Sequence, residues 1–300
     1  MKSLIQSVFS FLIIEASVCW NLLKSNIDGA FLPFPIFTMA SLLHIRAPWY
    51  NIIVLNLTYT DLENCVDTLI YAFFYQYVFE LTNQTARPAH RLEDEINKPD
   101  RPLVTNSMTL RSARTRYYVG LVVWLAYSYV LGTQLWTMLW LVTVFGSWKY
   151  SIGLSDFGPT KDLSISIGLI AQLMAAWHIG GSNPIVAWHW VKILFMWMYP
   201  TIGIQDIRDV PGDKAVGRRT TVILLGDVPG LYIYISHWVL ACRNDAYTVT
   251  VSAAIVALTF GTVFRLFAWR SIKSDRKTYR YYMGLYLLKL VAVCVCMREG

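Results

Sequence analysis

The sequence predicts an all-α membrane protein, a polytopic transmembrane bundle of about nine helices, and three observations support that class. Hydrophobic residues make up 55% of the 300 residues and charged residues 15%, and the mean hydropathy is +0.42. An average soluble domain has about 25% charged residues, so this chain has too little polar surface to cover itself in water. Long apolar runs recur along the chain, and most basic residues lie in alternate connections between them. This composition excludes a disordered chain, a coiled coil and an ordinary cytosolic enzyme.

Nine apolar runs approach or reach the length needed to cross about 30 Å of hydrocarbon. Because lipid offers no partners to backbone N–H and C=O groups, each run is predicted to be a helix, and no strands are expected. The runs lie at residues 30–45, 64–82, 117–135, 136–150, 163–181, 184–205, 219–240, 247–268 and 280–297. No linker or low-complexity segment divides them, so we predict one transmembrane domain over residues 1–300.

Two N-terminal segments have no certain place in that count. Residues 1–25 begin with Lys2 and an apolar run, as a signal peptide would, but Glu15 interrupts the run. We therefore favour a leading helix that is interfacial or partly buried. Residues 46–63 contain a proline and several charged side chains, among them Asp61. This composition favours a loop with a short surface helix.

The distribution of basic residues tests the order of the crossings. Eighteen of the 26 Lys and Arg residues fall in four alternate loops, whereas the intervening loops hold only Arg46 and Arg243. The four basic loops are residues 83–116, 148–162, 206–219 and 269–280. Loops rich in Lys and Arg stay on the cytosolic side of a membrane, so the pattern predicts a multi-pass integral membrane protein with these loops in the cytosol. Because the charges sit in short loops rather than along one face, we expect no nucleic-acid partner.

Acidic residues are concentrated in two polar windows, and each window starts where an apolar helix is predicted to end. We call residues 80–102 the first acidic window and residues 205–220 the second acidic window. Together they contain eight of the 19 acidic residues, namely Glu80, Glu93, Asp94, Glu95, Asp100, Asp206, Asp209 and Asp213. Both windows lie on the predicted cytosolic side, so their side chains are expected to meet there.

Three carboxylates of the second acidic window are spaced to share one face of a helix. Asp206, Asp209 and Asp213 fall at positions i, i+3 and i+7. Pro211 is predicted to end that helix near Val210, because the residue before a proline avoids the α region. The helix dipole disfavours carboxylates at a C-terminus, and a divalent cation would reverse that effect. Oxygen ligands on short loops suit Mg²⁺, which commonly binds one or two carboxylates together with phosphate oxygens.

Basic residues beside these carboxylates complete a candidate site for a metal and a diphosphate. Lys and Arg hold phosphate oxygens, Arg through two parallel hydrogen bonds. The residues expected to do so are Lys98, Arg101, Lys149, Arg208, Lys214 and Arg218. The alternative is that both windows are ordinary solvated loops. Two such loops on one side of the membrane, each at a helix end, favour the metal–diphosphate site.

The two windows resemble those of the UbiA superfamily of intramembrane prenyltransferases. The second acidic window reads Asp206-x-x-Asp209-x-x-x-Asp213 and continues into GRRT at residues 217–220, and the first contains INKPDRP at residues 96–102. The resemblance implies a UbiA-like fold of nine helices around a central cavity, with Asp-rich motifs after helices 2 and 6. It also implies Mg²⁺ as cofactor, and a prenyl diphosphate substrate and the lipid bilayer as partners.

The first acidic window departs from the family pattern, in which an Asn is followed by Asp at intervals of four. Here Asp94 lies eleven residues after Asn83, and His90 stands where an Asp is expected. The first acidic window therefore offers fewer aspartates as metal ligands than the family pattern, and Glu93 and Glu80 are the candidates to replace the missing one. The resemblance implies the metal ligands Asn83, Glu93, Asp94, Asp206, Asp209 and Asp213, and all of these except Glu93 are expected to be catalytic.

This form of the first acidic window is similar to that of fungal UbiA-type terpene cyclases. The resemblance implies Mg²⁺-dependent ionisation of farnesyl or geranylgeranyl diphosphate, followed by intramolecular cyclisation to a terpene. Aromatic faces would steer the cation, and Tyr71 and Tyr75 are spaced for one helix face, as are Trp136 and Trp140. Aromatic residues also fill cores and membrane interfaces, so none is named as catalytic. The fungal resemblance makes the endoplasmic reticulum the expected membrane.

Two other functions stay open on the sequence. A UbiA-type prenyltransferase that moves the prenyl group to an aromatic or lipid acceptor would use the same ionisation site, and no sequence motif separates the two enzymes. A transporter of an anionic substrate would explain the basic loops. It predicts charged residues at mid-membrane in several helices, whereas here the acids cluster at helix ends. No protein partner is inferred.

Overall fold

The computed structural model describes residues 2–45, 58–85, 88–145, 154–226 and 246–297. Within these ranges the regular structure is helical, with an isolated bridge between Phe157 and Arg219, so the predicted all-α class is confirmed. The elements are α1 (Lys2–Leu23), η1 (Ile27–Phe31), α2 (Pro33–Ile45), α4 (Tyr59–Thr85), α5 (Pro88–Asn97), α6 (Leu110–Val130), α7 (Gln134–Val144), η3 (Leu154–Asp156), α8 (Gly158–Ile179), α9 (Pro184–Thr201), η4 (Ile202–Arg208), α10 (Val210–Ala215), α11 (Thr221–Leu225), α13 (Ala246–Ala268) and α14 (Ile272–Met297).

Four helices of the described chain are long and apolar enough to cross a membrane. They are Ile27–Ile45 (η1 and α2 together), Gly158–Ile179, Val249–Ala268 and Ile272–Met297, and they coincide with predicted crossings. Helices α4, α6, α7 and α9 overlap four further predicted crossings but are shorter or less apolar. The crossing at 219–240 and the end of that at 136–150 extend outside the described residues. The count of nine therefore stays a prediction.

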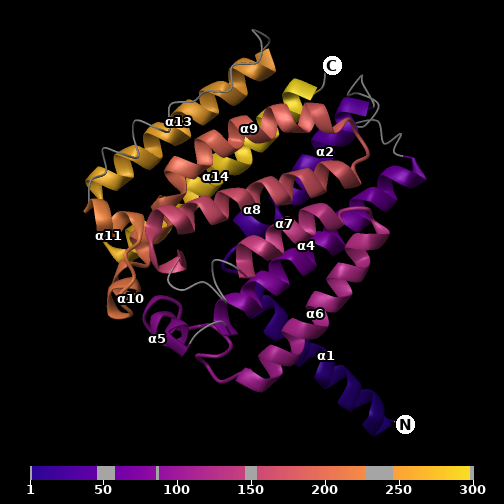
Figure 1. The fold of residues 1–300 in the computed structure, drawn as a ribbon, viewed down its shortest axis with the longest axis vertical. Helices are drawn as coiled ribbons and strands as arrows, with labels where there is room; N and C mark the ends of the chain where they lie inside the picture. Colours follow the sequence, from indigo (N-terminus) through magenta and orange to yellow (C-terminus); the bar gives the residue numbers. More distant parts are fainter. Residues whose placement is uncertain (1, 46–57, 86–87, 146–153, 227–245, 298–300) are drawn as a thin grey trace.

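The long helices run side by side, and the short helices gather at one end of the bundle (Figure 1). Helix α8 packs between α7 and α9 and also contacts α2, which in turn packs against α4 and α14. Helices α5 and α10, which carry parts of the two acidic windows, lie against each other (Figure 1). The fold thus brings two distant stretches of sequence to the same end of the bundle.

Aromatic side chains fill the interior of the bundle, while large apolar side chains also cover parts of its outside. The largest fully buried side chains include Trp124, Trp177, Trp197, Tyr71, Tyr117, Tyr286, Phe34 and Phe37. On the outer faces, Val119 and Val122 of α6 and Phe260 and Phe264 of α13 are exposed. Such apolar surface is unfavourable in water but ordinary against lipid tails.

At the end of the bundle opposite α5 and α10, neutral hydroxyl groups join α2 to α4 and α8. Thr38 Oγ1 lies 3.0 Å from Thr68 Oγ1 and donates to the Ala176 carbonyl at 2.9 Å. Ser41 Oγ donates to the Trp177 carbonyl at 3.0 Å. These groups are buried and satisfied, so we treat this neutral hydroxyl seam as structural.

The start and end of α4 differ from the sequence prediction. Residues 46–63 were expected to be a loop with a short surface helix. Residues 59–63 are helical, but they form the start of the long helix α4, and Asp61 there is buried. Residues 46–57 lie outside the described part of the chain. Thr58 N and Oγ1 both donate to Asp61 Oδ2 at 2.8 Å, which ties down the first turn of the helix. At its other end α4 continues to Thr85, three residues beyond the predicted run 64–82, so Asn83 lies in its last turn.

The predicted helix across the second acidic window is also wrong. Helix α9 ends at Thr201, the chain tightens into the 3₁₀ helix η4, and a new helix, α10, starts at Val210. Pro200 and Gly203, both poor helix formers, flank the end of α9. Pro211 occupies the first turn of α10, where no N–H is needed, and so begins a helix instead of ending one. The three aspartates therefore do not share the face of one helix.

The predicted leading helix at residues 1–25 is present as α1. It packs against α4, and the Glu15 carboxylate forms an ion pair with Arg116 of α6. Val18 and Leu22 are its buried side chains, whereas Phe9, Leu12 and Trp20 are exposed.

Candidate active site

The first acidic window contributes side chains from two helices. Glu80 and Asn83 come from the last turns of α4, and Glu93 and Asp94 come from α5. All four side chains are buried, although carboxylates are rarely buried without a partner. Their burial indicates that the fold supplies compensating charges nearby.

Arg101 supplies that compensation for two of the carboxylates. Its Nη1 donates to both carboxylate oxygens of Asp94 at 2.9 Å, and its Nη2 donates to Glu80 Oε2 at 3.2 Å. The other Glu80 oxygen accepts from Asn26 Nδ2, just before η1. Burial acts to lower the pKa of the Arg101 guanidinium, but the charges of Asp94 and Glu80 raise that pKa above its ordinary value. Arg101 therefore stays charged and fixes Asp94 against α4.

The second acidic window holds its carboxylates on a broken helix. Asp206 lies on η4, Asp209 at the junction of η4 and α10, and Asp213 in the first turn of α10. Lys161 Nζ of α8 donates to Asp206 Oδ1 at 2.5 Å. Lys98 Nζ lies 3.5 Å from Asp209 Oδ2. The break in the helix thus lets two of these carboxylates reach cations on different elements.

Arg218 joins the two windows directly. Its Nη1 donates to Glu93 Oε2 at 2.9 Å and to Asp213 Oδ1 at 3.1 Å. Its Nη2 also donates to the Ser155 carbonyl at 3.0 Å. Both acidic windows are thereby held around one buried guanidinium.

The pKa values of two aspartates move in opposite directions. Burial acts to raise the pKa of the Asp209 carboxyl, but the positive charges of Lys98 and Arg208 outweigh it and hold that pKa below its ordinary value. For Asp213, burial outweighs the charges of Lys161 and Arg218 and raises the pKa to about 7.

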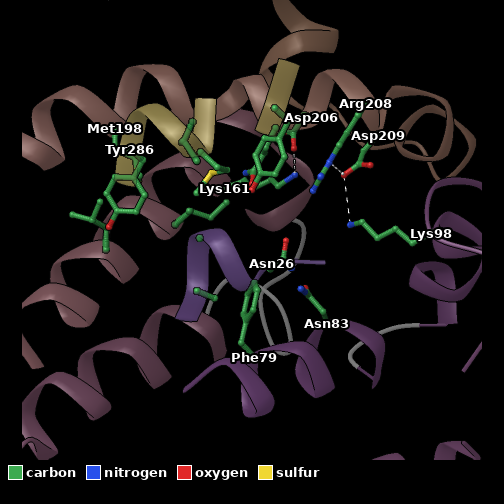
Figure 2. Close-up of a pocket in the computed structure, with 18 of the residues that line it drawn as sticks. Asn26, Phe79, Asn83, Lys98, Lys161, Met198, Asp206, Arg208, Asp209 and Tyr286 are labelled. Carbon is green, nitrogen blue, oxygen red and sulfur yellow. Dashed lines mark hydrogen bonds and ion pairs between the residues drawn. The ribbon is translucent and has the colours of Figure 1, made fainter. Parts of the chain in front are cut away.

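One cavity lies between the two windows and extends into the bundle, with about 1050 Å³ of space that includes its open mouth. Figure 2 shows Lys98, Asp206, Arg208 and Asp209 toward one end of it and Met198 and Tyr286 toward the other. The polar lining residues are Asn26, Asn83, Glu93, Asp94, Lys98, Arg101, Lys161, Gln172, Gln205, Asp206, Arg208, Asp209 and Arg218. The lining also includes Tyr75, Phe79, Trp140, Ile165, Leu169, Met198, Ile202, Tyr279, Met283 and Tyr286.

Most residues predicted for the site therefore line this cavity. The predicted metal ligands Asn83, Glu93, Asp94, Asp206 and Asp209 are among them, as are the predicted phosphate-binding residues Lys98, Arg101, Arg208 and Arg218. Asp213 is fully buried behind Arg218 and is not on the cavity wall. Lys214 is exposed on α10 and away from the cavity lining. Lys149 lies outside the described residues.

Several lining residues were not predicted as site residues from the sequence. Lys161 was counted only as a loop charge, although it is buried in the first turn of α8. Tyr279 of α14 stacks under the Arg208 guanidinium, with 3.9 Å from Cζ to the ring centroid. Tyr75 and Trp140 stack on each other with ring centroids 4.8 Å apart. In the sequence, Tyr75 and Trp140 were indicated only by their helical spacing from other aromatic residues, which did not show that they contact each other.

The oxygen atoms of the second acidic window fit a hard cation. Asp206 Oδ2 and Asp213 Oδ2 are buried and have no hydrogen-bond partner among the described residues. As the side chains lie, no three His, Cys, Asp or Glu residues of the described ranges are close enough together to hold a metal ion, because cations stand between the carboxylates. The donor chemistry matches Mg²⁺, and these cations would have to change partners when a metal binds.

Residues 53–288 match the UbiA prenyltransferase family. The chain belongs to this family. With its four apolar helices, it is an integral membrane protein. The resemblance predicted from the two acidic windows is thereby confirmed.

Relatives of the chain are named as a synthase, a cyclase and a transferase. The chain is 28% identical to the somaliensene A/B synthase of Streptomyces somaliensis over 95% of this chain and 94% of the relative. It is 30% identical to the diterpene cyclase eriG of Hericium erinaceus (73% and 72% covered) and 29% identical to the polyprenyl transferase eriF of the same fungus (72% and 76%). The fold is similar to that of a UbiA homologue from Archaeoglobus fulgidus bound to GPP and Mg²⁺, with a TM-score of 0.61, 16% identity and coverage of 93% and 99%.

Proposed function

We propose that this protein is a membrane-bound terpene cyclase of secondary metabolism that ionises farnesyl or geranylgeranyl diphosphate and closes the resulting cation on itself. The observation that carries the proposal is a single cavity that is charged at one end and largely aromatic and aliphatic in the rest of its lining (Figure 2). The charged part suits a diphosphate, and the apolar part suits a prenyl chain. The names of two relatives, a somaliensene synthase and a diterpene cyclase, support the same chemistry.

At the charged end, we propose that Asn83, Glu93, Asp94, Asp206, Asp209 and Asp213 hold Mg²⁺. The unpartnered oxygens of Asp206 and Asp213, and the solved homologue that contains GPP and Mg²⁺, support this assignment. When bound, the metal supplies positive charge that stabilises the diphosphate as a leaving group. Asp213 would take part through a shift of Arg218, which now covers it.

The basic side chains are proposed to bind the diphosphate by exchanging partners. Lys98, Lys161 and Arg218 are now paired with carboxylates of the two windows. With those carboxylates bound to a metal, Lys98, Lys161 and Arg218 would be free to donate strong charge-assisted hydrogen bonds to phosphate oxygens. Arg101 is held by Asp94 and Glu80 on two sides, so its first role is to position Asp94.

In the interior of the cavity, ring faces would stabilise the carbocation. Tyr75, Phe79, Trp140, Tyr279 and Tyr286 line it from α4, α7 and α14. Each ring can contribute about 0.5–2 kcal/mol of cation–π attraction. The apolar walls also exclude water, which would otherwise capture the cation. The cyclised cation then loses a proton to the released diphosphate, which gives the neutral hydrocarbon, so no nucleophilic side chain is needed for this reaction.

The names of two relatives, a synthase and a cyclase, favour cyclisation over transfer to an acceptor. In the cavity wall, Gln172 Nε2 already donates to the carbonyls of Gly29 and Ala30 at 3.2 and 3.1 Å. Tyr286 Oη and Trp140 Nε1 also line the cavity, have no hydrogen-bond partner among the described residues, and could bind a polar acceptor. The relative named polyprenyl transferase keeps transfer to an acceptor as the second candidate.

The test is an incubation of the purified protein in detergent with Mg²⁺ and farnesyl or geranylgeranyl diphosphate, without any acceptor. We expect release of diphosphate together with a cyclic hydrocarbon detected by mass spectrometry. Turnover that begins only after an aromatic or lipid acceptor is added would identify a prenyltransferase instead.

We also propose that both acidic windows face the cytosol. Cysteines placed in α5 and α10 test this: a membrane-impermeant thiol reagent should label them only from the cytosolic side.

A further inference from the structure

Asn97, the last residue of α5, connects the two acidic windows through its side-chain amide. Its Nδ2 donates to the Asp209 carbonyl at 2.9 Å, and its Oδ1 accepts from the Gly212 N–H at 3.1 Å. Asn97 is buried and does not line the cavity. Helices α5 and α10, which it joins, lie side by side in Figure 1. The amide thus pairs with the backbone of the opposite window at two points.

Asn97 lies close in the chain or in space to proposed site residues of both acidic windows. Asp94 lies one helical turn before Asn97 on α5, and Lys98 follows directly and pairs with Asp209 Oδ2. On the other side, the carbonyl that Asn97 binds belongs to Asp209 itself. Arg276 of α14 donates to the Asn97 carbonyl at 2.7 Å, so a third element fixes the same residue.

Gly212 is matched to Asn97 by shape. A Cβ atom at position 212 would lie 2.3 Å from Asn97 Nδ2 and 2.6 Å from its Cγ, which is closer than real Cβ contacts. The backbone of Gly212 is not left-handed, so the requirement for glycine there comes from this contact and not from conformation. The amide side chain at position 97 offers a donor and an acceptor on two separate atoms, which matches the carbonyl of Asp209 and the N–H of Gly212.

We propose that Asn97 and Gly212 form a clamp that sets the register of the two acidic windows, with Asn97 as a positioning residue for the metal and diphosphate ligands. This inference rests on the proposed function, because a register matters most where both windows must hold one diphosphate. A displacement of about 1 Å at such a site can cost a factor of about 100 in rate. The clamp therefore acts on Asp94 and Asp209 without touching the substrate.

A double-mutant cycle tests the clamp, with Asn97→Ala, Gly212→Ala and the double variant measured in detergent. Asn97→Ala should lower kcat/KM by about 10- to 100-fold and raise the Mg²⁺ concentration for half-maximal diphosphate release. Gly212→Ala should be similarly harmful where Asn97 is present. It should add less than about a twofold loss in the Asn97→Ala background, because the added methyl group then has room. Asn97→Asp, which keeps the shape and loses the donor, should also raise the Mg²⁺ requirement.

Gly180→Ala is the matched control. Its Cβ would lie 2.5 Å from Ser41 Oγ, a clash of the same size, but beyond the last residue of α8, about 30 Å along that helix from the charged end. It should lower the melting temperature and leave the Mg²⁺ requirement unchanged. A loss of stability alone would therefore lower the melting temperature of Gly180→Ala without changing its Mg²⁺ requirement, whereas a change at the site alters the Mg²⁺ requirement.

Two results would overturn the clamp. One is an equal loss from Gly212→Ala in both backgrounds, and the other is an unchanged Mg²⁺ requirement in both Asn97 variants. If the wild-type protein releases no diphosphate from any prenyl substrate, the proposed function fails. The clamp is then tested by the melting temperatures of the same four proteins of the double-mutant cycle. Additive losses of melting temperature would then overturn it, and coupled losses would support it.

Discussion

In the neutral hydroxyl seam, near the start of α4 and the end of α8, uncharged side chains join the helices, whereas at the opposite end of the same two helices buried charged side chains face one another. In the neutral hydroxyl seam, Thr38 and Ser41 each donate to a backbone carbonyl. At the charged end, Asp206 and Asp213 each leave one carboxylate oxygen without a hydrogen-bond partner among the described residues. The neutral hydroxyl seam is thus satisfied, whereas the charged end keeps carboxylate oxygens that a cationic ligand would bind.

This difference separates structural polar groups from functional ones. A satisfied neutral hydrogen bond contributes about 1 kcal/mol to folding, whereas a buried ion pair roughly breaks even with apolar residues of the same volume. Stability alone therefore does not explain why six carboxylates of the two acidic windows are buried at one end of a membrane bundle, namely those of Glu80, Glu93, Asp94, Asp206, Asp209 and Asp213. The experiments below test whether the two ends differ as this argument requires.

The largest effect is expected for Arg218→Met. This change leaves the carboxylates of Glu93 and Asp213 buried without their shared cation, so the free energy of unfolding should fall by about 3–5 kcal/mol. Thermal unfolding in detergent measures the loss. Arg219→Met is the matched control, because that side chain is exposed, and it should melt close to wild type. Equal melting temperatures for the two variants would contradict the central role of Arg218.

Asp206→Asn should cause the next largest effect, this time on turnover. The substitution keeps the shape of the side chain and an oxygen for Lys161, but removes the charge proposed to hold Mg²⁺. We expect diphosphate release to fall by about 10²- to 10³-fold, as when one preorganised electrostatic contact is removed. Asp100→Asn, at a side chain that is 62% exposed, should retain the wild-type rate. Similar rates for both variants would remove Asp206 from the site.

A smaller effect is expected from ligand binding without any reaction. If the charged end holds a metal with a diphosphate, then Mg²⁺ plus inorganic diphosphate should stabilise the folded protein by about 2.7 kcal/mol at one hundred times the dissociation constant. A rise in melting temperature that EDTA reverses, and that Asp206→Asn abolishes, is the expected result. A rise of the same size in Asp206→Asn would place the ligand elsewhere.

In the interior of the cavity, two variants at Tyr286 separate the ring from its hydroxyl group. Tyr286→Phe keeps the ring face and should change the rate little. Tyr286→Leu removes the ring and should lower the rate roughly twofold to thirtyfold, with a shift in the ratio of products. Mass spectrometry of the products gives both numbers. Equal effects of Phe and Leu would assign the role to the hydroxyl group instead.

The sequence allowed the all-α class and the meeting of the two acidic windows to be predicted, because both follow from patterns that are local in the chain. Apolar run length and charge segregation do not depend on which helix packs against which. The pairing of each carboxylate does depend on packing. Lys161 reaches Asp206, and Asn97 reaches Asp209, only because α8 and α5 come from elsewhere in the chain to meet the second acidic window.

The error at Pro211 has a similar origin. A proline is compatible both with the end of one helix and with the first turn of the next. In this chain α9 already ends at Thr201, and the 3₁₀ helix η4 follows it, so Pro211 lies at the start of a new helix. The same break lets the chain turn so that the aspartates face different cations. Propensity rules treat each residue with its neighbours and carry no information on that turn.

The smallest effect is expected in the neutral hydroxyl seam, from Thr38→Val. The hydroxyl of Thr38 bonds to Thr68 and to the Ala176 carbonyl, but both partners keep another bond. Thr68 Oγ1 still donates to the Asn64 carbonyl, and the Ala176 carbonyl still accepts from the Gly180 N–H. No buried group is left unsatisfied, so the free energy of unfolding should fall by only about 0.5–1.5 kcal/mol. Diphosphate release should equal that of the wild type, and a large loss of turnover without loss of melting temperature would show that the two ends of the bundle are coupled.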